Sequence, residues 1–170
     1  MLHKHPQSVL LIQPLVIILS VLWFRLVLFK PFRNGAEELY ERPMTPTAQS
    51  KLFHPEGIHS GNCYAACLAS LLDLPLWMVP PWEDMFGRGA WKQRTDEWLE
   101  RLFQQRLVRT QGHELAILPE FYIANGLSPR EVYHSVIYSA GKLVHDPHPS
   151  NAGIGDVEWT WHLEPVALAA

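Results

Sequence analysis

The sequence predicts an α+β fold, with helices in the first part of the domain and an antiparallel sheet after them. Three observations lead to this prediction. A nearly uninterrupted apolar run over 62–72 contains strong helix formers. Apolar residues recur at helical spacing over 91–107. Short strand-like segments separated by turn residues follow from residue 114 onward. Helices followed by strands are typical of an α+β domain in which a helix packs on the sheet.

The first helix is predicted over 63–72, with Asn62 as its N-cap residue. It is apolar on nearly every side, so we expect it to lie buried at the centre of the fold. The prolines of 73–81 are expected to end it, because proline breaks helices. The second helix is predicted over 91–107, and Thr95 is an alternative N-cap for a shorter version of it.

The strand predictions rest on β-branched and aromatic residues between turn signals. The segment Ser139-Ala140-Gly141 is expected to form a three-residue hairpin loop, because glycine at its last position is typical of such loops. We predict weak strands over 114–119 and 121–124, clearer strands over 133–138 and 142–145, and a final strand over 157–162.

The composition limits the class of protein. A chain of 170 residues has room for one ordinary domain. Residues 1–43 carry five basic and three acidic residues, a charge of +2, and the remainder carries nine basic and fourteen acidic residues, a charge of −5. A body of that charge lacks the basic surface of a nucleic-acid-binding protein, so no nucleic-acid partner is expected. The two cysteines are expected to be free thiols, which favours a reducing compartment.

An apolar span precedes the domain. Residues 9–29 are 21 residues long and would extend about 31 Å as a helix, the thickness of a bilayer core. We therefore predict a tail over 1–8, a transmembrane helix over 9–29, a linker over 30–46 and a folded domain over 47–170. Most basic residues near the span follow it, which predicts a single-pass protein of the inner or cytoplasmic membrane with a cytoplasmic domain. The alternative is a soluble cytoplasmic protein whose translation starts at Met44.

Three residues predict a nucleophilic site. Cys63 begins a helix, where free amide groups and the helix dipole favour the thiolate. With a three-residue loop at 139–141, His134 and Asp146 stand directly opposite on neighbouring strands, with Cβ atoms about 4.5–5.5 Å apart. The carboxylate is expected to accept the Nδ1 proton of the imidazole, and the other ring nitrogen to take the thiol proton. Cys67 is expected to be a core residue.

These residues resemble a known family. The run from Asn62 to Ala69 (Asn-Cys-Tyr-Ala-Ala-Cys-Leu-Ala), then His134-Ser135-Val136 and Asp146-Pro147, resemble papain-like cysteine peptidases, notably those that remove double-glycine leaders from bacteriocins. The chain is also similar to small uncharacterised papain-like proteins of phages and bacteria, which share three further stretches. These are Leu74-Pro75-Leu76, Ser128-Pro129-Arg130 and residues 145–150.

The resemblance covers about 47–165 and implies a papain-like fold. It implies Cys63 as nucleophile, His134 as base and then acid, and Asp146 as the group that orients the histidine. One position departs from the pattern. The leader peptidases carry a glutamine six residues before the nucleophile that helps to bind the oxyanion, and here that residue is Gly57. A missing oxyanion donor costs on the order of 10²–10³ in rate.

The second oxyanion donor is therefore expected elsewhere, beside the Cys63 backbone N–H. Its candidates are Gln49, His59 and Asn62. Trp82 is a candidate wall of a substrate groove, and Arg130 is expected either to bind a substrate carboxylate or to form a surface salt bridge.

The predicted function is a thiol-dependent hydrolase of an amide, peptide or isopeptide bond with a peptide or protein substrate. No cofactor or metal is expected. One alternative is a catalytically weak papain-like module that binds a peptide or protein, which Gly57 favours. The other is an acyltransferase of transglutaminase type.

Overall fold

The structure, a computed structural model, describes residues 44–54, 61–111 and 118–166, which all belong to one compact unit, Tyr40–Ala170. The predicted transmembrane helix over 9–29 lies outside the described residues, as do the tail and most of the linker. Within the described part, no single helix has the length and apolarity needed to cross a membrane. One pair bent by 101°, Cys63–Leu71 with Leu76–Phe86, meets that test only when taken together.

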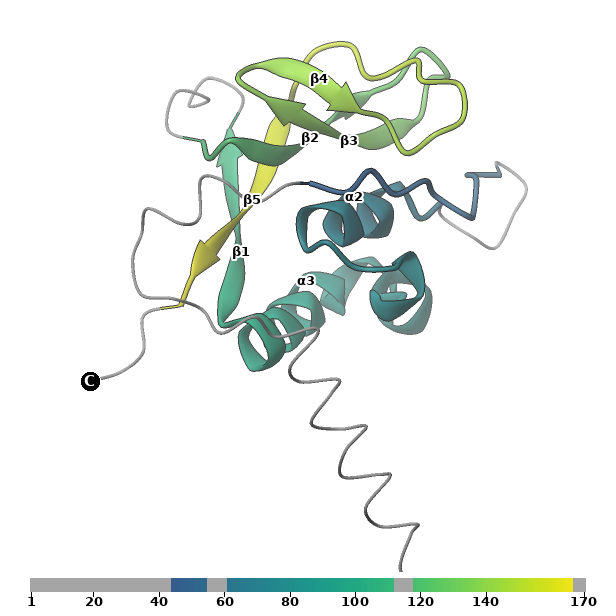
Figure 1. Cartoon of the computed structure of the whole chain (residues 1–170). Coiled ribbons are helices and arrows are strands. Elements are labelled where there is room, and N and C mark those ends of the chain that lie inside the picture. Colours follow the sequence, from purple (N-terminus) through teal and green to yellow (C-terminus); the bar gives the residue numbers. More distant parts are fainter. Residues whose placement is uncertain (1–43, 55–60, 112–117, 167–170) are drawn as a thin grey trace, which may run out of the picture. The chain divides into compact units, whose positions relative to one another are not determined.

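Helices precede an antiparallel sheet, as the sequence predicts (Figure 1). The helices are α2 (Cys63–Leu71), the 3₁₀ helix η2 (Leu76–Met78) and α3 (Trp82–Phe103). The strands are β1 (Gln105–Gln111), β2 (Phe121–Leu127), β3 (Tyr133–Ser139), β4 (Lys142–His145) and β5 (Trp159–Pro165). They form one five-stranded sheet in the order β1-β5-β2-β3-β4, and every neighbouring pair is antiparallel. The α+β prediction is confirmed.

The core lies between the helices and one face of the sheet. Helix α2 packs on β3 and β2, and α3 packs on β1. Leu68 and Cys67 of α2 are fully buried with Ile123 of β2 and Ile137 of β3. A smaller cluster around Tyr122, Ala124 and Val136 covers the opposite face. Because successive strand residues alternate between faces, the odd-numbered residues of β2 and β3 face α2.

Helix α2 has the predicted start and the predicted burial. Its middle, Ala66–Ser70, is buried, in agreement with its apolar composition. The prediction that Asn62 caps it is wrong for the side chain, which makes no capping bond. Its Oδ1 instead accepts hydrogen bonds from the backbone N–H groups of Ser50 (3.1 Å) and Lys51 (2.8 Å). Asn62 therefore ties the segment before α2 to the start of that helix.

Helix α3 differs most from its prediction. It begins at Trp82 rather than at residue 91, since proline is compatible with the start of a helix and Pro81 lies just before its first turn. Thr95 is no cap but an interior residue whose hydroxyl donates to the Trp91 carbonyl at 2.9 Å. The helix ends at Phe103, because Gln104 takes a left-handed conformation with φ 55°. Strand β1, which the sequence analysis did not predict, follows directly.

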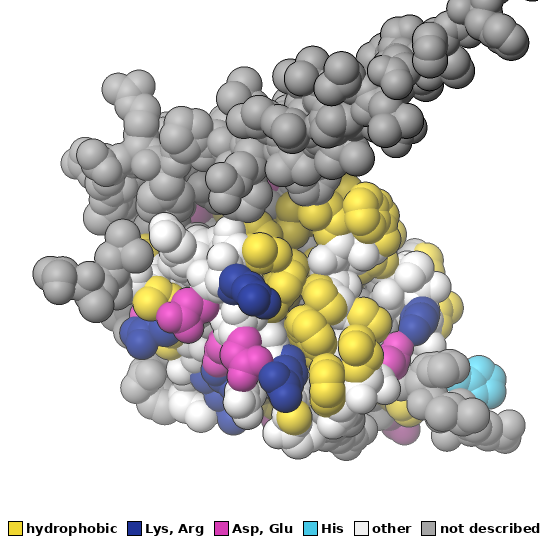
Figure 2. Space-filling view, turned by 90° about the horizontal axis from the view of Figure 1, so that it is seen from below, with side chains coloured by type: hydrophobic (Ala, Val, Ile, Leu, Met, Phe, Trp, Pro, Cys, Tyr) yellow, Lys and Arg dark blue, Asp and Glu magenta, His cyan; other side chains and the backbone are white. Residues whose placement is uncertain are grey.

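The face seen in Figure 2 shows hydrophobic side chains gathered among charged ones. Exposed large hydrophobic residues of the helical part are Trp77, Met85, Phe86 and Leu102. Charged side chains of α3 pair along the helix, as in the Arg94–Glu97 bridge of 2.8 Å. The surface of α3 is therefore mixed in character.

The hairpin between β3 and β4 lies where predicted but has another register. Ala140 and Gly141 both have positive φ, 47° and 75°, and form a two-residue turn, so Ser139 pairs with Lys142. An irregularity after Ile137 then shifts the register, and Ile137 pairs with His145. The predicted three-residue loop is wrong for this reason.

The other strand predictions are partly right. Strand β2 begins where predicted and runs three residues further, and β5 begins and ends later than predicted. The segment 112–117, with most of the weak strand predicted over 114–119, lies outside the described residues.

Candidate functional site

The predicted contact between His134 and Asp146 is present, although the register that led to it is wrong. His134 is the second residue of β3, and Asp146 directly follows β4. The imidazole Nε2 lies 2.7 Å from Asp146 Oδ1. The two side chains are only 4% and 1% exposed. The structure corrects the predicted ring nitrogen, because Nε2 rather than Nδ1 meets the carboxylate.

The carboxylate of Asp146 is held on both oxygens. The backbone N–H of His148 donates to Oδ1 at 2.8 Å, and the N–H of Gly153 donates to Oδ2 at 2.8 Å. Gly153 has φ 66°, a conformation that glycine adopts without strain. Burial by itself raises the pKa of Asp146, but the hydrogen bonds from His134, His148 and Gly153 outweigh it and hold the pKa below its ordinary value. Asp146 is therefore ionised at neutral pH.

The tautomer of His134 follows from this charge. An ionised carboxylate only accepts hydrogen bonds, so Nε2 carries the proton and Nδ1 carries the lone pair. Burial lowers the pKa of His134 more than Asp146 raises it, and the nearby charges of Arg130 and His148 lower it further. The imidazole is thus neutral at neutral pH, with Nδ1 as its basic nitrogen.

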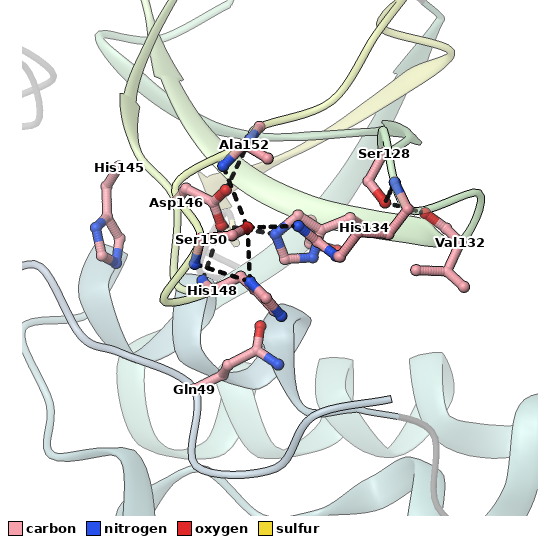
Figure 3. A network of polar contacts seen from close by, with 12 residues as sticks. Gln49, Ser128, Val132, His134, His145, Asp146, His148, Ser150 and Ala152 are labelled. Carbon is pink, nitrogen blue, oxygen red and sulfur yellow. Dashed lines mark hydrogen bonds and ion pairs between the residues drawn. The ribbon is translucent and has the colours of Figure 1, made fainter. Parts of the chain in front are cut away.

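A second histidine lies beside the first. The rings of His134 and His148 meet edge to face with centroids 6.0 Å apart. Figure 3 shows His148 between His134 and Gln49. The N–H of Ser150 donates to His148 Nδ1 at 3.0 Å, and Arg130 donates to the Ser150 hydroxyl at 2.7 Å. Arg130 therefore supports the loop after Asp146, and among the described residues it meets no carboxylate, so the surface salt bridge is not found.

Cys63 lies at the start of α2, against the residue that follows His134. Burial raises the pKa of the Cys63 thiol, and hydrogen bonding with the backbone and side chain of Ser135 lowers it only in part. The charge of Glu83 raises the pKa further. The expectation that the helix terminus favours the thiolate is therefore wrong, because burial dominates. His134 is an even-numbered residue of β3, on the side of the strand opposite Ser135 and Ile137, and within the described residues no hydrogen bond joins the Cys63 sulfur to it. The structure therefore brings His134 and Asp146 together but does not bring Cys63 into contact with them.

Ser135 and Cys67 complete the surroundings of the thiol. The Ser135 hydroxyl donates to Asn125 Oδ1 at 2.7 Å across β2 and β3, which fixes its position. Cys67 is fully buried in the core, and burial raises the pKa of its thiol well above the ordinary value. Its position is that of the core residue that the sequence predicts.

The three oxyanion candidates fare differently. The Asn62 carboxamide is held by the segment before α2: Oδ1 accepts from Ser50 and Lys51, and Nδ2 donates one of its two hydrogens to the Ser50 hydroxyl at 3.0 Å. His59 lies outside the described residues, as does Gly57. Gln49 Nε2 likewise donates one of its two hydrogens, to the Lys51 carbonyl at 2.8 Å, the same oxygen that accepts the Asn62 N–H. Its amide nitrogen is thus held next to the residue that precedes Cys63.

Gln49 also touches the other half of the site. Its backbone N–H donates to the carbonyl of Pro147 at 3.0 Å, next to Asp146. His145, the last residue of β4, reaches the same segment, with Nε2 2.9 Å from the Thr47 carbonyl. Gln49 Oε1 is buried without a partner among the described residues. The segment 47–51 therefore spans from the His134–Asp146 pair to the start of α2.

Sequence reasoning assigned no role to several residues of this site. Gly153, Ser135 and Ser150 act through backbone or hydroxyl groups that carry no motif of their own. For His148 a signal existed, since it lies two residues after Asp146 in the stretch 145–150.

Trp82, a predicted groove residue, lines a pocket together with Asn62 and Tyr64, the neighbours of Cys63 in the sequence. Among the described residues, no three His, Cys, Asp or Glu side chains gather as metal ligands would.

Comparisons of the chain with protein-family models, with curated proteins and with solved structures find no match in any of the three.

Proposed function

We propose that this chain is a thiol-dependent hydrolase of papain-like type that cleaves an amide, peptide or isopeptide bond. Cys63 is its nucleophile, His134 its general base and acid, and Asp146 the group that orients His134. The observation that carries the proposal is the buried His134–Asp146 pair, in which Nε2 is 2.7 Å from a held carboxylate and Nδ1 is left as the base.

The proposed chemistry uses these atoms in order. His134 Nδ1 takes the Cys63 thiol proton as the sulfur attacks the substrate carbonyl carbon. The tetrahedral intermediate then breaks its C–N bond, and His134 gives that proton to the leaving amine. Water attacks the resulting thioester while Nδ1 accepts a proton. The C–S bond breaks, which releases a carboxylate and restores the thiol.

The proposed oxyanion donors are the Cys63 N–H and the Gln49 carboxamide. The first intrahelical bond of α2 runs from the Ala66 N–H to the Asn62 carbonyl, so the Cys63 N–H has no role in the helix ladder. Gln49 is supported by its contact with the Lys51 carbonyl beside Asn62. An amide nitrogen in this position can replace the glutamine that Gly57 does not provide.

The raised pKa of Cys63 and the lowered pKa of His134 favour a neutral thiol and a neutral imidazole at rest. Attack then needs proton transfer to His134 in the same step. The rate of Cys63 alkylation by iodoacetamide should accordingly show two limbs against pH. The first rises as His134 loses its proton, below about pH 6.5, and the second rises above about pH 9 as the thiolate forms.

The test is this alkylation profile in the full chain, followed by mass spectrometry of the Cys63 and Cys67 peptides. His134→Ala should remove the low-pH limb and lower the rate at pH 7 by about tenfold or more. Asp146→Ala should lower it as well, because the tautomer is no longer fixed. His162→Ala, which removes another buried imidazole of the sheet, should change neither limb.

Cys67 is the internal control, since its side chain is fully buried and should stay unmodified in every variant. A single limb that is identical in wild type and His134→Ala would show that the two residues do not act together.

A second function has one observation in its favour. The raised pKa of Cys63 and the lack of a hydrogen bond to His134 within the described residues suit a papain-like module that binds a peptide without cleaving it. Such a module would give the single-limb profile, and its ligand affinity would survive Cys63→Ala. The two-limb profile favours the hydrolase.

A further inference from the structure

The segment that joins α2 to α3 leaves large hydrophobic side chains on the surface (Figure 1). Residues 74–82, Leu-Pro-Leu-Trp-Met-Val-Pro-Pro-Trp, contain no charged residue. Trp77 is 80% exposed, and Met85 and Phe86, near the start of α3, are 59% and 42% exposed. Three large exposed hydrophobic side chains within ten residues of sequence are typical of a surface that contacts a membrane or another protein.

The charged residues at this segment are engaged within the protein. Asp84 is paired with Lys51 at 2.6 Å, and Glu83, the other acidic residue of 74–86, also has an interaction of its own. The Arg94 guanidinium lies 5.2 Å from the centre of the Phe86 ring and is itself ion-paired. Binding at this surface therefore depends on its apolar side chains more than on charge.

The described domain begins beside the same segment. The Thr45 hydroxyl donates to the Asp73 carboxylate, and the Thr47 backbone N–H donates to the Ser70 hydroxyl at 2.9 Å. Asp73 directly precedes the segment 74–86 in the sequence. These bonds fix the start of the domain at the end of α2 from which the exposed segment departs.

The predicted transmembrane span 9–29 is separated from the described domain only by residues 30–43. A fully stretched chain covers about 3.3–3.6 Å per residue, so this connection reaches at most about 50 Å. With 9–29 in a bilayer, the start of the domain stays within that distance of the lipid surface. The exposed segment beside it is then present at a high effective concentration near the lipid.

We propose that Trp77, Met85 and Phe86 dock on the surface of the bilayer that anchors the chain and so orient the domain on the membrane. Tryptophan is enriched at membrane interfaces, where its ring lies at the depth of the headgroups. The charge of −5 on residues 44–170 disfavours anionic lipid, so the matching surface is a zwitterionic one. The proposal rests on the predicted span over 9–29 and is independent of the proposed hydrolase function.

The experiment measures the tryptophan fluorescence of the full chain in phosphatidylcholine vesicles, with and without bromine on the acyl chains. Bromine quenches a tryptophan that contacts the lipid. The difference between wild type and Trp77→Ser isolates the emission of Trp77, because the other tryptophans cancel. This emission should be lost in brominated vesicles and should resist iodide, a quencher in the aqueous phase. Met85→Ser should reduce the loss.

Leu143→Trp is the matched control. Leu143 is exposed on β4, which lies on the other side of α2 from α3 (Figure 1). The emission that this variant adds should be quenched by iodide and not by brominated lipid. Equal quenching by bromine at Leu143→Trp and at Trp77 would overturn the proposal, because no particular face would then be docked.

Trp23, within the predicted span, is measured in the same way through Trp23→Phe. We expect bromine to quench both Trp23 and Trp77. Quenching of Trp77 alone would keep the docking surface and remove the anchor. Quenching of Trp23 alone, or of neither, would overturn the proposal. A Trp77 that resists both bromine and iodide would be covered by protein, which would overturn it as well. None of these results depends on the alkylation profile of Cys63.

Discussion

The two halves of the candidate site are built in different ways. In the histidine half, Asp146 accepts three hydrogen bonds of 2.7–2.8 Å, from His134, His148 and Gly153. In the cysteine half, the thiol hydrogen-bonds with Ser135 and, within the described residues, has no hydrogen bond to His134. The base is therefore fixed before any ligand binds, and the nucleophile depends on the base for its activation.

The two halves of the site should also contribute differently to the stability of the fold. Groups that are fully bonded and buried contribute to folding, and their loss leaves unpaired donors inside the protein. Groups with unused hydrogen-bonding capacity near a pocket contribute little to folding. Substitutions in the histidine half should thus destabilise the chain strongly, and substitutions in the cysteine half should affect it weakly.

The largest effect is expected from Asp146→Asn. The amide nitrogen would face either the Gly153 N–H or the donors that now meet Oδ1, so two donors would oppose each other in a buried place. We expect a loss of about 3 kcal/mol in the free energy of unfolding, measured by urea denaturation. Asp156→Asn, at an exposed aspartate, is the control and should cost less than about 0.5 kcal/mol. Equal values for both variants would contradict the account.

Gly126→Ala comes next. Gly126 pairs with His134 across β2 and β3, and a Cβ added to it would lie 2.2 Å from the Asp156 carbonyl oxygen. Backbone must therefore move, and we expect a loss of about 1–3 kcal/mol. Gly89→Ala has open space around the added Cβ and should be neutral or stabilising. A neutral Gly126→Ala would mean that this end of the sheet is not rigid.

A smaller effect is expected from acid. Burial is the main cause of the lowered pKa values of His134 and His148, so the unfolded chain takes up protons before the folded one. Their contribution to stability is present above about pH 6.5 and is lost as the pH falls through the folded pKa. Asp146, whose folded pKa is also lowered, adds a further loss below about pH 4.

Urea denaturation between pH 7 and pH 5 measures the histidine part of this loss. His134→Gln should flatten the curve in that range, because it removes the main titrating group. Stability that rises toward pH 5 would have the wrong sign for a neutral, buried imidazole.

Cys63→Ala should have the smallest effect. The side chain is half-buried and lies outside the main core cluster, so we expect a change within about 1 kcal/mol. Cys67→Ser is the contrasting variant, because it puts a hydroxyl into a fully buried apolar place and should cost more. If Cys63→Ala were the more damaging of the two, the thiol would be a structural element.

The sequence predicts the elements with strong local patterns. Helix α2 is predicted to within one residue, because its apolar run and helix formers agree. The start of α3 is missed because Pro80 and Pro81 predict the end of a helix, although proline is equally compatible with a helix start. Strand β1 is missed because Leu102, Phe103 and Leu107 fit a helical stripe as well as a helix followed by a strand.

Local sequence patterns do not predict the strand register at the site or the contacts between its distant segments. The pairing of His134 with Asp146 was predicted from a register that the left-handed Ala140 makes wrong, and nothing in an alanine signals that conformation. The contact survives because Asp146 lies beyond the strand, where the ladder no longer sets its position. Gln49 is held by bonds to Pro147 and Lys51, which are distant in sequence from each other.

At neutral pH, His134 is a neutral imidazole whose Nε2 is protonated and whose Nδ1 carries the lone pair. The most direct test is ¹⁵N NMR of the imidazole nitrogens of His134 at pH 7, assigned by comparison with His134→Gln. We expect a protonated signal for Nε2 and an unprotonated, pyridine-type signal for Nδ1. A protonated Nδ1, in the other tautomer or in an imidazolium, would contradict it.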